Sequence, residues 1–206
     1  MALIVYLIGF VLLNVLISIT MQKISQKYDK AEGYIGICSY SISFCVIFIL
    51  IMRHEEYKEL IVYFGWGTHG IYDLALALSI AILIYVFRMT FLIKNAKIIK
   101  IYFQIAAKAE DFYKIIIAPI CEEILYRNLL LADMLKSHNL LFSAFAVSFI
   151  FSISHLHYEK FVYFFVCSFI FSYLFYFSGS VLYSIFSHIL YNLLCCAIVV
   201  QTDSNE

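Results

Sequence analysis

The sequence predicts an all-α membrane protein, a bundle of about seven transmembrane helices, from its composition and its distribution of charge. Hydrophobic residues make up 64% of the 206 residues and charged residues 14%, whereas soluble domains average about 45–50% and about 25%. Charged residues are absent from residues 2–20, 33–52, 137–158 and 161–202. A membrane-spanning helix needs about 20 mostly apolar residues. Each of the first three stretches therefore fits one span, and the last is long enough for two.

The apolar runs indicate helices rather than the strands of a membrane barrel. Residues 2–8 are continuously apolar, whereas barrel strands alternate apolar and polar residues. The expected spans are 2–20, 33–52, 72–93, 112–132, 140–157, 160–177 and 181–200, the last two separated at Ser178-Gly179-Ser180. The third span carries Asp73 and Arg88 near its ends, where such side chains can extend to water.

The connections between the spans predict how the chain is oriented. The first contains Lys23, Lys27 and Lys30, and the third contains Lys94, Lys97, Lys100 and Lys108. The second and fourth together contain Arg53, Lys58 and Lys136. Because basic residues concentrate on the cytoplasmic side, we expect the N-terminus outside and the C-terminus in the cytoplasm.

Two connecting segments have a recognisable character. Residues 65–68, Gly-Trp-Gly-Thr, are typical of an interfacial loop with an aromatic anchor. Residues 94–111 fit either a basic helix lying in the membrane interface or an ordinary basic loop. We divide the chain into N-terminal helices with this basic segment (1–111), a helical core (112–200) and a short polar tail (201–206). The formal net charge of zero gives no reason to expect a nucleic-acid partner.

The fourth expected span contains three ionisable residues, Glu122, Glu123 and Arg127. Such residues are costly inside a membrane and are candidates for function. Glu123 and Arg127 are four residues apart in the order that favours an ion pair, so we assign them to the scaffold of the site. Glu122 points about 100° away around the helix. Partial burial there suits a general base, and we assign Glu122 to proton transfer.

Three further polar residues lie on two other expected spans. His155 ends the sequence Phe-Ser-Ile-Ser-His of the fifth span, and His188 and Asn192 lie four residues apart on the last. An imidazole and an amide on one face of a helix can donate hydrogen bonds to the same oxygen, as an oxyanion site requires. Their occurrence together with Glu122 predicts a hydrolytic site between the helices.

Together these motifs resemble the CPBP family of intramembrane proteases, also called the Abi family. The matching residues are Glu122-Glu123-x-x-x-Arg127, Phe151-x-x-x-His155 and His188-x-x-x-Asn192, within residues 112–200. The family includes CAAX prenyl endopeptidases and bacteriocin-processing or self-immunity proteins. The resemblance implies that Glu122 and His155 activate a water and that His188 and Asn192 stabilise the oxyanion.

The sequence favours a reaction without a metal, although Glu122, His155 and His188 could together bind a zinc ion. The expected function is an endopeptidase of the bacterial cell membrane, acting on a membrane-associated protein or peptide such as a CAAX-type substrate, a bacteriocin leader or a propeptide. One alternative is a non-enzymatic immunity or sensor-modulating protein that keeps these residues for structure. A proton-coupled transporter is another, but no internal repeat of the kind common in transporters is visible.

Overall fold

The computed structural model describes residues 65–67, 69–93, 99–103, 109–155 and 160–202, together with the single positions 9, 12, 16 and 49. The chain divides into two compact units, Met1–Val62 and Tyr63–Glu206. The first two expected spans fall outside the described residues, apart from those single positions. The elements from residue 65 onward all belong to the second unit.

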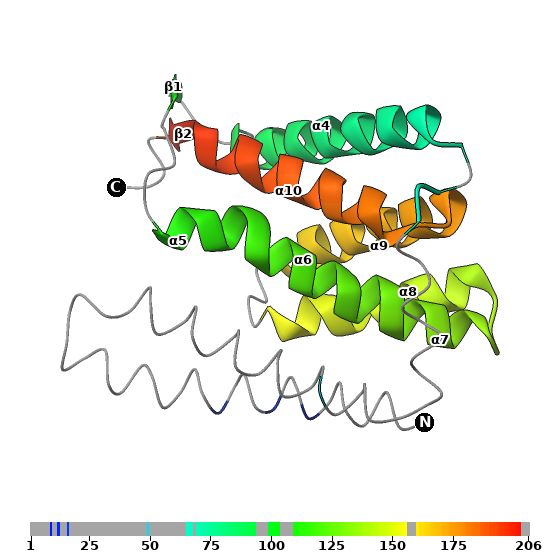
Figure 1. Cartoon of the computed structure of the whole chain (residues 1–206). Helices are drawn as coiled ribbons and strands as arrows, with labels where there is room; N and C mark the ends of the chain where they lie inside the picture. Colours follow the sequence, from blue (N-terminus) through cyan, green and yellow to red (C-terminus); the bar gives the residue numbers. More distant parts are fainter. Residues whose placement is uncertain are drawn as a thin grey trace. The chain divides into compact units, whose positions relative to one another are not determined.

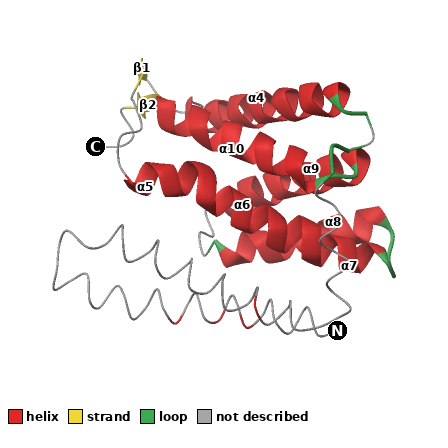
Figure 2. Ribbon diagram, in the orientation of Figure 1, coloured by secondary structure: helices red, strands yellow, loops and turns green. Residues whose placement is uncertain are grey.

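The second unit is built from helices that lie where the third to seventh spans were expected (Figures 1 and 2). They are α4 (Ile71–Ile93), a long helix between residues 109 and 135, α8 (Leu140–Ser154), α9 (Phe161–Ser178) and α10 (Val181–Ala197). The helical fold class is thus confirmed for the described residues. Among them, the segments Ile71–Thr90 and Phe161–Ser178 are long and apolar enough to cross a membrane. The count of seven spans stays a prediction.

The long helix consists of five consecutive segments with two hydrogen-bonding patterns. They are α5 (Ala109–Phe112), η2 (Tyr113–Ile117), α6 (Ala118–Glu123), η3 (Ile124–Leu131) and α7 (Ala132–Leu135), of which η2 and η3 are π-helical. Wide π-helical turns are rare and often occur at functional sites. The acidic pair lies at the end of α6, directly before the longer of the two π segments.

Short polar motifs end and begin the helices. The Asn139 side chain accepts a hydrogen bond of 2.9 Å from the amide of Phe142 at the start of α8. Gly179 has a left-handed φ of 67° and ends α9, and the Ser180 side chain accepts from the amide of Leu182 at the start of α10. The expected break between the last two spans is therefore a glycine stop followed by a serine N-cap.

Residues 99–103 form a strand, so a helix in the membrane interface is wrong for this part of segment 94–111. Strand β1 (Ile99–Phe103) pairs antiparallel with β2 (Ile198–Thr202), which follows α10 directly. Ile99, Ile101 and Phe103 alternate with Lys100 and Tyr102, which is the period of a strand. Because the lysines of this segment recur every three residues, their spacing favoured a helix over this two-residue alternation. The last helix accordingly ends at Ala197 and not at residue 200.

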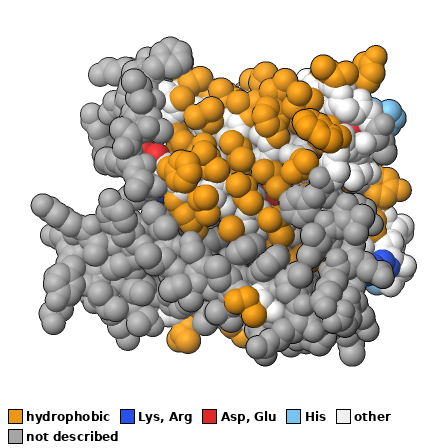
Figure 3. All heavy atoms as spheres, in the orientation of Figure 1, with side chains coloured by type: hydrophobic (Ala, Val, Ile, Leu, Met, Phe, Trp, Pro, Cys, Tyr) orange, Lys and Arg blue, Asp and Glu red, His pale blue; other side chains and the backbone are white. Residues whose placement is uncertain are grey.

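α10 is the central helix of the second unit. It packs against α4, α9 and α6, while α8 packs against α9 (Figure 1). Large apolar side chains lie exposed on the outer faces, and Figure 3 shows hydrophobic side chains over α4 and α10. The exposed ones on these two helices include Ile82, Leu83, Val86, Phe186 and Leu193. Buried serines lie between the helices: Ser143, Ser148, Ser152, Ser168, Ser172, Ser178, Ser180, Ser184 and Ser187. Apolar surfaces and small polar contacts between helices are typical of a membrane bundle.

The loop before α4 is attached to the start of α10. The Tyr183 hydroxyl donates to the carbonyls of Trp66, at 2.6 Å, and Gly70, at 3.1 Å. Trp66 itself is 84% exposed, as an interfacial anchor would be. Asp73 was expected to reach water, but it is 5% exposed and accepts a hydrogen bond from the His69 amide. The carboxylate therefore lies buried at the start of α4, where it accepts this hydrogen bond from the loop.

Candidate active site

Glu123 and Arg127 form a fully buried ion pair at the centre of the site. The Arg127 Nε atom lies 3.1 Å from Glu123 Oε2, and neither side chain is exposed. The Nη2 group of Arg127 donates to the carbonyl and hydroxyl oxygens of Ser168 on α9, at 3.0 and 2.9 Å. The guanidinium also lies over the rings of Phe151 and Phe171, at 5.0 and 5.6 Å. Arg127 therefore joins the long helix to both α8 and α9.

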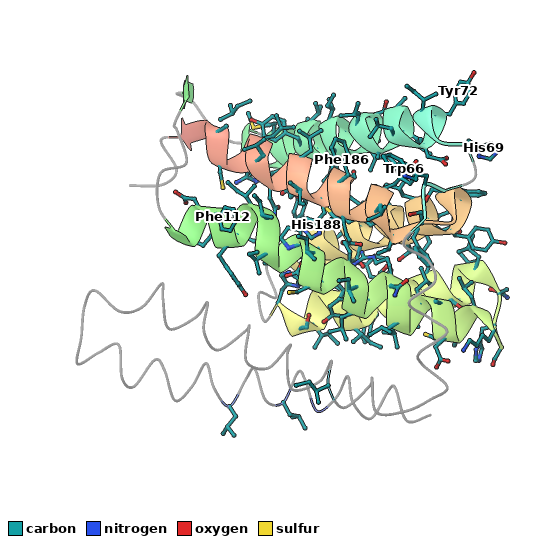
Figure 4. All side chains as sticks on the ribbon, viewed as in Figure 1. Trp66, His69, Tyr72, Phe112, Phe186 and His188 are labelled. Atoms are coloured by element: carbon teal, nitrogen blue, oxygen red, sulfur yellow. The ribbon has the colours of Figure 1, made fainter. Side chains whose placement is uncertain are left out.

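His188 brings α10 to both glutamates. Its Nδ1 atom lies 2.8 Å from Glu123 Oε1, and its Nε2 atom lies 3.9 Å from Glu122 Oε2. The ring stacks on Phe171, with centroids 5.1 Å apart. In Figure 4 the labelled His188 lies between α10 and α6. Glu123 is therefore more than a scaffold residue, because the same carboxylate that neutralises Arg127 orients the imidazole.

Glu122 differs from Glu123 in its surroundings, although the two are adjacent in sequence. Its side chain keeps 13% of its surface exposed, whereas that of Glu123 keeps none. The separation of 3.9 Å between Glu122 Oε2 and His188 Nε2 is too long for a direct hydrogen bond. Polar groups at such a separation are commonly bridged by water, so this pair can hold a small polar molecule between a carboxylate and an imidazole.

His155 lies at the end of α8, in contact with aromatic rings. Its Nδ1 atom is 2.8 Å from the carbonyl oxygen of Phe151, and its ring stacks on Phe164 and leans against Phe151. The Arg127 guanidinium also lies over the Phe151 ring, so this ring contacts both Arg127 and His155. His155 thus contacts Phe151 and His188 contacts Phe171, the two rings that pack on the Arg127 guanidinium.

Asn192 lies one turn beyond His188 on α10. Its Nδ2 group donates to the carbonyl of Lys114, at 2.9 Å. His188 thus contacts Glu123, and Asn192 contacts Lys114. These two contacts show that the long helix and α10 run antiparallel where they meet. One hydrogen of the amide is used by Lys114, and the second is available to another acceptor.

The comparison with known proteins bears on this part of the chain. The family of type II CAAX prenyl endopeptidases, Rce1-like, matches residues 110–194. Residues 110–194 are therefore similar to this family, and we call them the Rce1-like region. The match confirms the resemblance to the CPBP family, and it runs from α5 through most of α10. Rce1-like proteins are membrane-embedded proteases. No curated protein and no solved structure matches the chain significantly.

Hydrogen bonding defines the tautomer of each histidine in the Rce1-like region. The carbonyl of Phe151 can only accept, so Nδ1 of His155 carries the proton and its Nε2 is the basic atom. Nδ1 of His188 faces the Glu123 carboxylate and likewise carries a proton, so its Nε2 is the atom directed at Glu122.

The described donors of the Rce1-like region do not assemble a complete metal site. Three protein ligands with a fourth open position are usual for a catalytic zinc ion. Within residues 65–67, 69–93, 99–103, 109–155 and 160–202, no three His, Cys, Asp or Glu side chains group together in this way. Glu122 and His188 supply two donors, with Oε2 and Nε2 3.9 Å apart.

Several residues of the site were not expected from the sequence. Ser168 accepts from Arg127, Phe171 stacks on both Arg127 and His188, and the Tyr126 hydroxyl donates to Ser154 Oγ at 2.9 Å beside His155. The serines gave a usable signal, because small polar residues inside apolar helices mark helix contacts. Phe171 gave none, since it is one of 20 phenylalanines.

Proposed function

We propose that the protein is an intramembrane endopeptidase that hydrolyses a peptide bond of a membrane-associated protein or peptide. The observation that carries the proposal is the geometry around His188. The partly exposed Glu122 carboxylate lies 3.9 Å from His188 Nε2, and the buried Glu123 carboxylate contacts Nδ1 on the other edge of the same ring. The protease character of Rce1-like proteins supports the same conclusion.

Charge balance in the site supports an acid–base role for this pair. Glu123 and Arg127 neutralise each other, which leaves the negative charge of the mostly covered Glu122 side chain without compensation from this pair. A proton on His188 makes the group neutral overall, and neutral groups are far less costly to bury. We therefore assign the resting proton to the His188 imidazole, between the two carboxylates.

In the proposed reaction Glu122 acts as the general base. A water bound beside Glu122 loses a proton to the carboxylate as its oxygen attacks the carbonyl carbon of the peptide bond. Protonated Glu122 then returns that proton to the departing amine as the carbon–nitrogen bond breaks. Carboxylate and amine products result, and Glu122 is regenerated.

The oxyanion formed in this reaction needs hydrogen-bond donors. We assign this role to the Nε2–H of protonated His188 and to the second amide hydrogen of Asn192. His155, with its basic Nε2, is assigned to the orientation of the attacking water together with Glu122, as in the family. No metal takes part in this scheme, so activity is expected to persist in a chelator such as EDTA.

The Glu122→Gln variant tests the proposal. This variant keeps the shape of the side chain and removes the base. The rate at which the protein hydrolyses a substrate peptide should therefore fall by at least about 100-fold. Asp133→Asn makes the same chemical change on the same long helix, at a half-buried residue paired with Lys136, and should leave hydrolysis unchanged. Undiminished processing by Glu122→Gln would exclude the catalytic role and favour an immunity or sensor-modulating function.

The substrate is expected to be membrane-associated. A CAAX-type protein, a bacteriocin leader or a propeptide would each bring a peptide bond to helices of a bacterial cell membrane. Purified protein should be tested against one peptide of each kind, with and without EDTA. Cleavage of one kind identifies the substrate, and its loss in EDTA would contradict the metal-free scheme.

A further inference from the structure

The turn of α10 that carries His188 and Asn192 also carries Tyr191, which contacts α9. The hydroxyl groups of Tyr191 and Tyr163 hydrogen-bond to each other. Tyr163 lies in the first turn of α9, and its ring is stacked on Phe87 of α4, with the centroids 6.0 Å apart. The two tyrosines therefore join α10 to α9 at the level of the site, and the proposed reaction gives them no role.

Tyr191 and Asn192 are held on different sides of α10. Because successive residues of an α-helix are about 100° apart around its axis, Tyr191 lies about 60° to one side of His188 and Asn192 about 40° to the other. The Asn192 amide donates to the Lys114 carbonyl of the long helix at 2.9 Å. On the other side, the Tyr191 hydroxyl contacts α9 through Tyr163. Two bonds on different sides of a helix oppose its rotation about its axis, and the imidazole of His188 lies between them.

The tyrosine rings pack close to the ring that supports His188. Tyr163 and Tyr191 are partly buried against a core cluster that includes Phe171. The Phe171 ring is stacked on His188, with the centroids 5.1 Å apart. Apolar packing has no preferred direction, whereas a hydrogen bond between two hydroxyl groups does. The hydroxyl groups can therefore define an orientation of α10 that the packing of the rings alone leaves free.

We propose that Tyr163 and Tyr191 are positioning residues, which hold His188 Nε2 and the Asn192 amide in the orientation that stabilises the oxyanion. The inference rests on the proposed endopeptidase function and adds two residues that act through His188 and Asn192 without touching the substrate. Misplacing a reacting group by about 1 Å can cost about 100-fold in rate. Loss of the bond between the hydroxyl groups should therefore lower kcat, and it should leave KM unchanged because no contact with the substrate is removed.

Phenylalanine variants separate positioning from stability. Tyr163→Phe and Tyr191→Phe each leave one part-buried hydroxyl without its partner, so each should lower the melting temperature in detergent. The double variant leaves no hydroxyl unpaired, so its melting temperature should return close to that of the wild type. Its kcat should nevertheless stay about tenfold lower, with the same KM, for whichever of the three kinds of peptide the wild-type protein cleaves. Tyr176→Phe changes an exposed tyrosine of the same helix and should alter none of these quantities.

An NMR spectrum of the protein with isotope-labelled histidine tests the position of His188 without a substrate. The imidazole signals of His188, identified by their loss in His188→Gln, should shift in the double variant and stay in place in Tyr176→Phe. Unchanged His188 signals in the double variant would overturn the inference. A kcat that recovers together with the melting temperature would also overturn it, because the tyrosines would then serve stability alone. Failure of the proposed function is a separate result, full hydrolysis by Glu122→Gln, on which the His188 signals do not depend.

Discussion

Glu122 and Glu123 show how adjacent identical residues receive different tasks from their surroundings. Glu123 is fully buried between Arg127 and His188, and both of its oxygens are engaged by these two partners. Glu122 keeps part of its surface exposed and faces the other nitrogen of His188. Proton transfer needs access to the reacting molecule, whereas orientation needs rigidity. The difference in burial therefore separates a proposed base from a positioning residue.

Replacing Glu123 by glutamine should lower the stability of the protein as well as its rate of hydrolysis. The variant leaves the buried Arg127 charge without its counter-ion, which typically costs about 3–5 kcal/mol. We expect a clearly lower melting temperature in detergent for Glu123→Gln and an almost unchanged one for Glu122→Gln. Asp133→Asn is the matched control, because the half-buried Asp133 loses only a surface pair with Lys136. Equal melting temperatures for the two glutamate variants would contradict the different roles that we assign to Glu122 and Glu123.

The sequence predicted contacts within one helix better than contacts between helices. The spacing of Glu123 and Arg127 was enough to expect their ion pair, because residues four apart are neighbours on any helix. The bond between Glu123 and His188 depends on the antiparallel alignment of the long helix with α10, which no local spacing encodes. The same limit applies to His155. Its motif could be recognised, but its contacts with Phe151 and Phe164 follow from how α8 meets α9.

At the scale of elements, the loop before α4 depends on one glycine. Gly67 has a positive φ of 71°, and a Cβ atom there would lie 2.6 Å from the Tyr183 ring and 2.8 Å from the Ser178 carbonyl. Both neighbours belong to the α9–α10 region that holds the loop. A side chain at this position is therefore opposed by backbone conformation and by packing at once.

Gly67→Ala should lower the free energy of unfolding by about 2 kcal/mol or more, because strain and overpacking add. Gly65→Ala is the matched control, since nothing lies within 4 Å of a Cβ atom there, and surface changes of this kind usually stay within about 0.5 kcal/mol. Thermal unfolding of both variants in the same detergent makes the comparison. A Gly67→Ala protein as stable as the wild type would show that these contacts do not hold the loop.

Prediction of elements succeeded for long apolar helices and failed for the short strand. The helices from α4 to α10 lie close to the expected spans because about 20 apolar residues admit few alternatives. Strand β1 is only five residues long and gains its stability from β2, about 100 residues further along the chain. A pairing between segments so far apart cannot be recognised in a local pattern, although the alternation in residues 99–103 was present.

At the scale of the whole molecule, the ribbon of β1 and β2 links two predictions of orientation. β1 belongs to the lysine-rich connection after α4, and β2 follows α10 near the C-terminus. Paired strands lie on the same side of a membrane. The basic connection and the C-terminus must therefore share one compartment, whichever it is. The distribution of Lys and Arg predicts that this compartment is the cytoplasm.

Reporter fusions at Glu206 test this orientation. A green fluorescent protein joined to the C-terminus should fluoresce in bacterial cells, and alkaline phosphatase at the same position should be inactive, because that enzyme folds only outside the cytoplasm, where its disulfides form. A phosphatase fusion placed in the 53–64 connection should give the opposite result. Since β1 and β2 lie together, active phosphatase at the C-terminus would also place Lys94, Lys97, Lys100 and Lys108 outside, against the basic-residue rule.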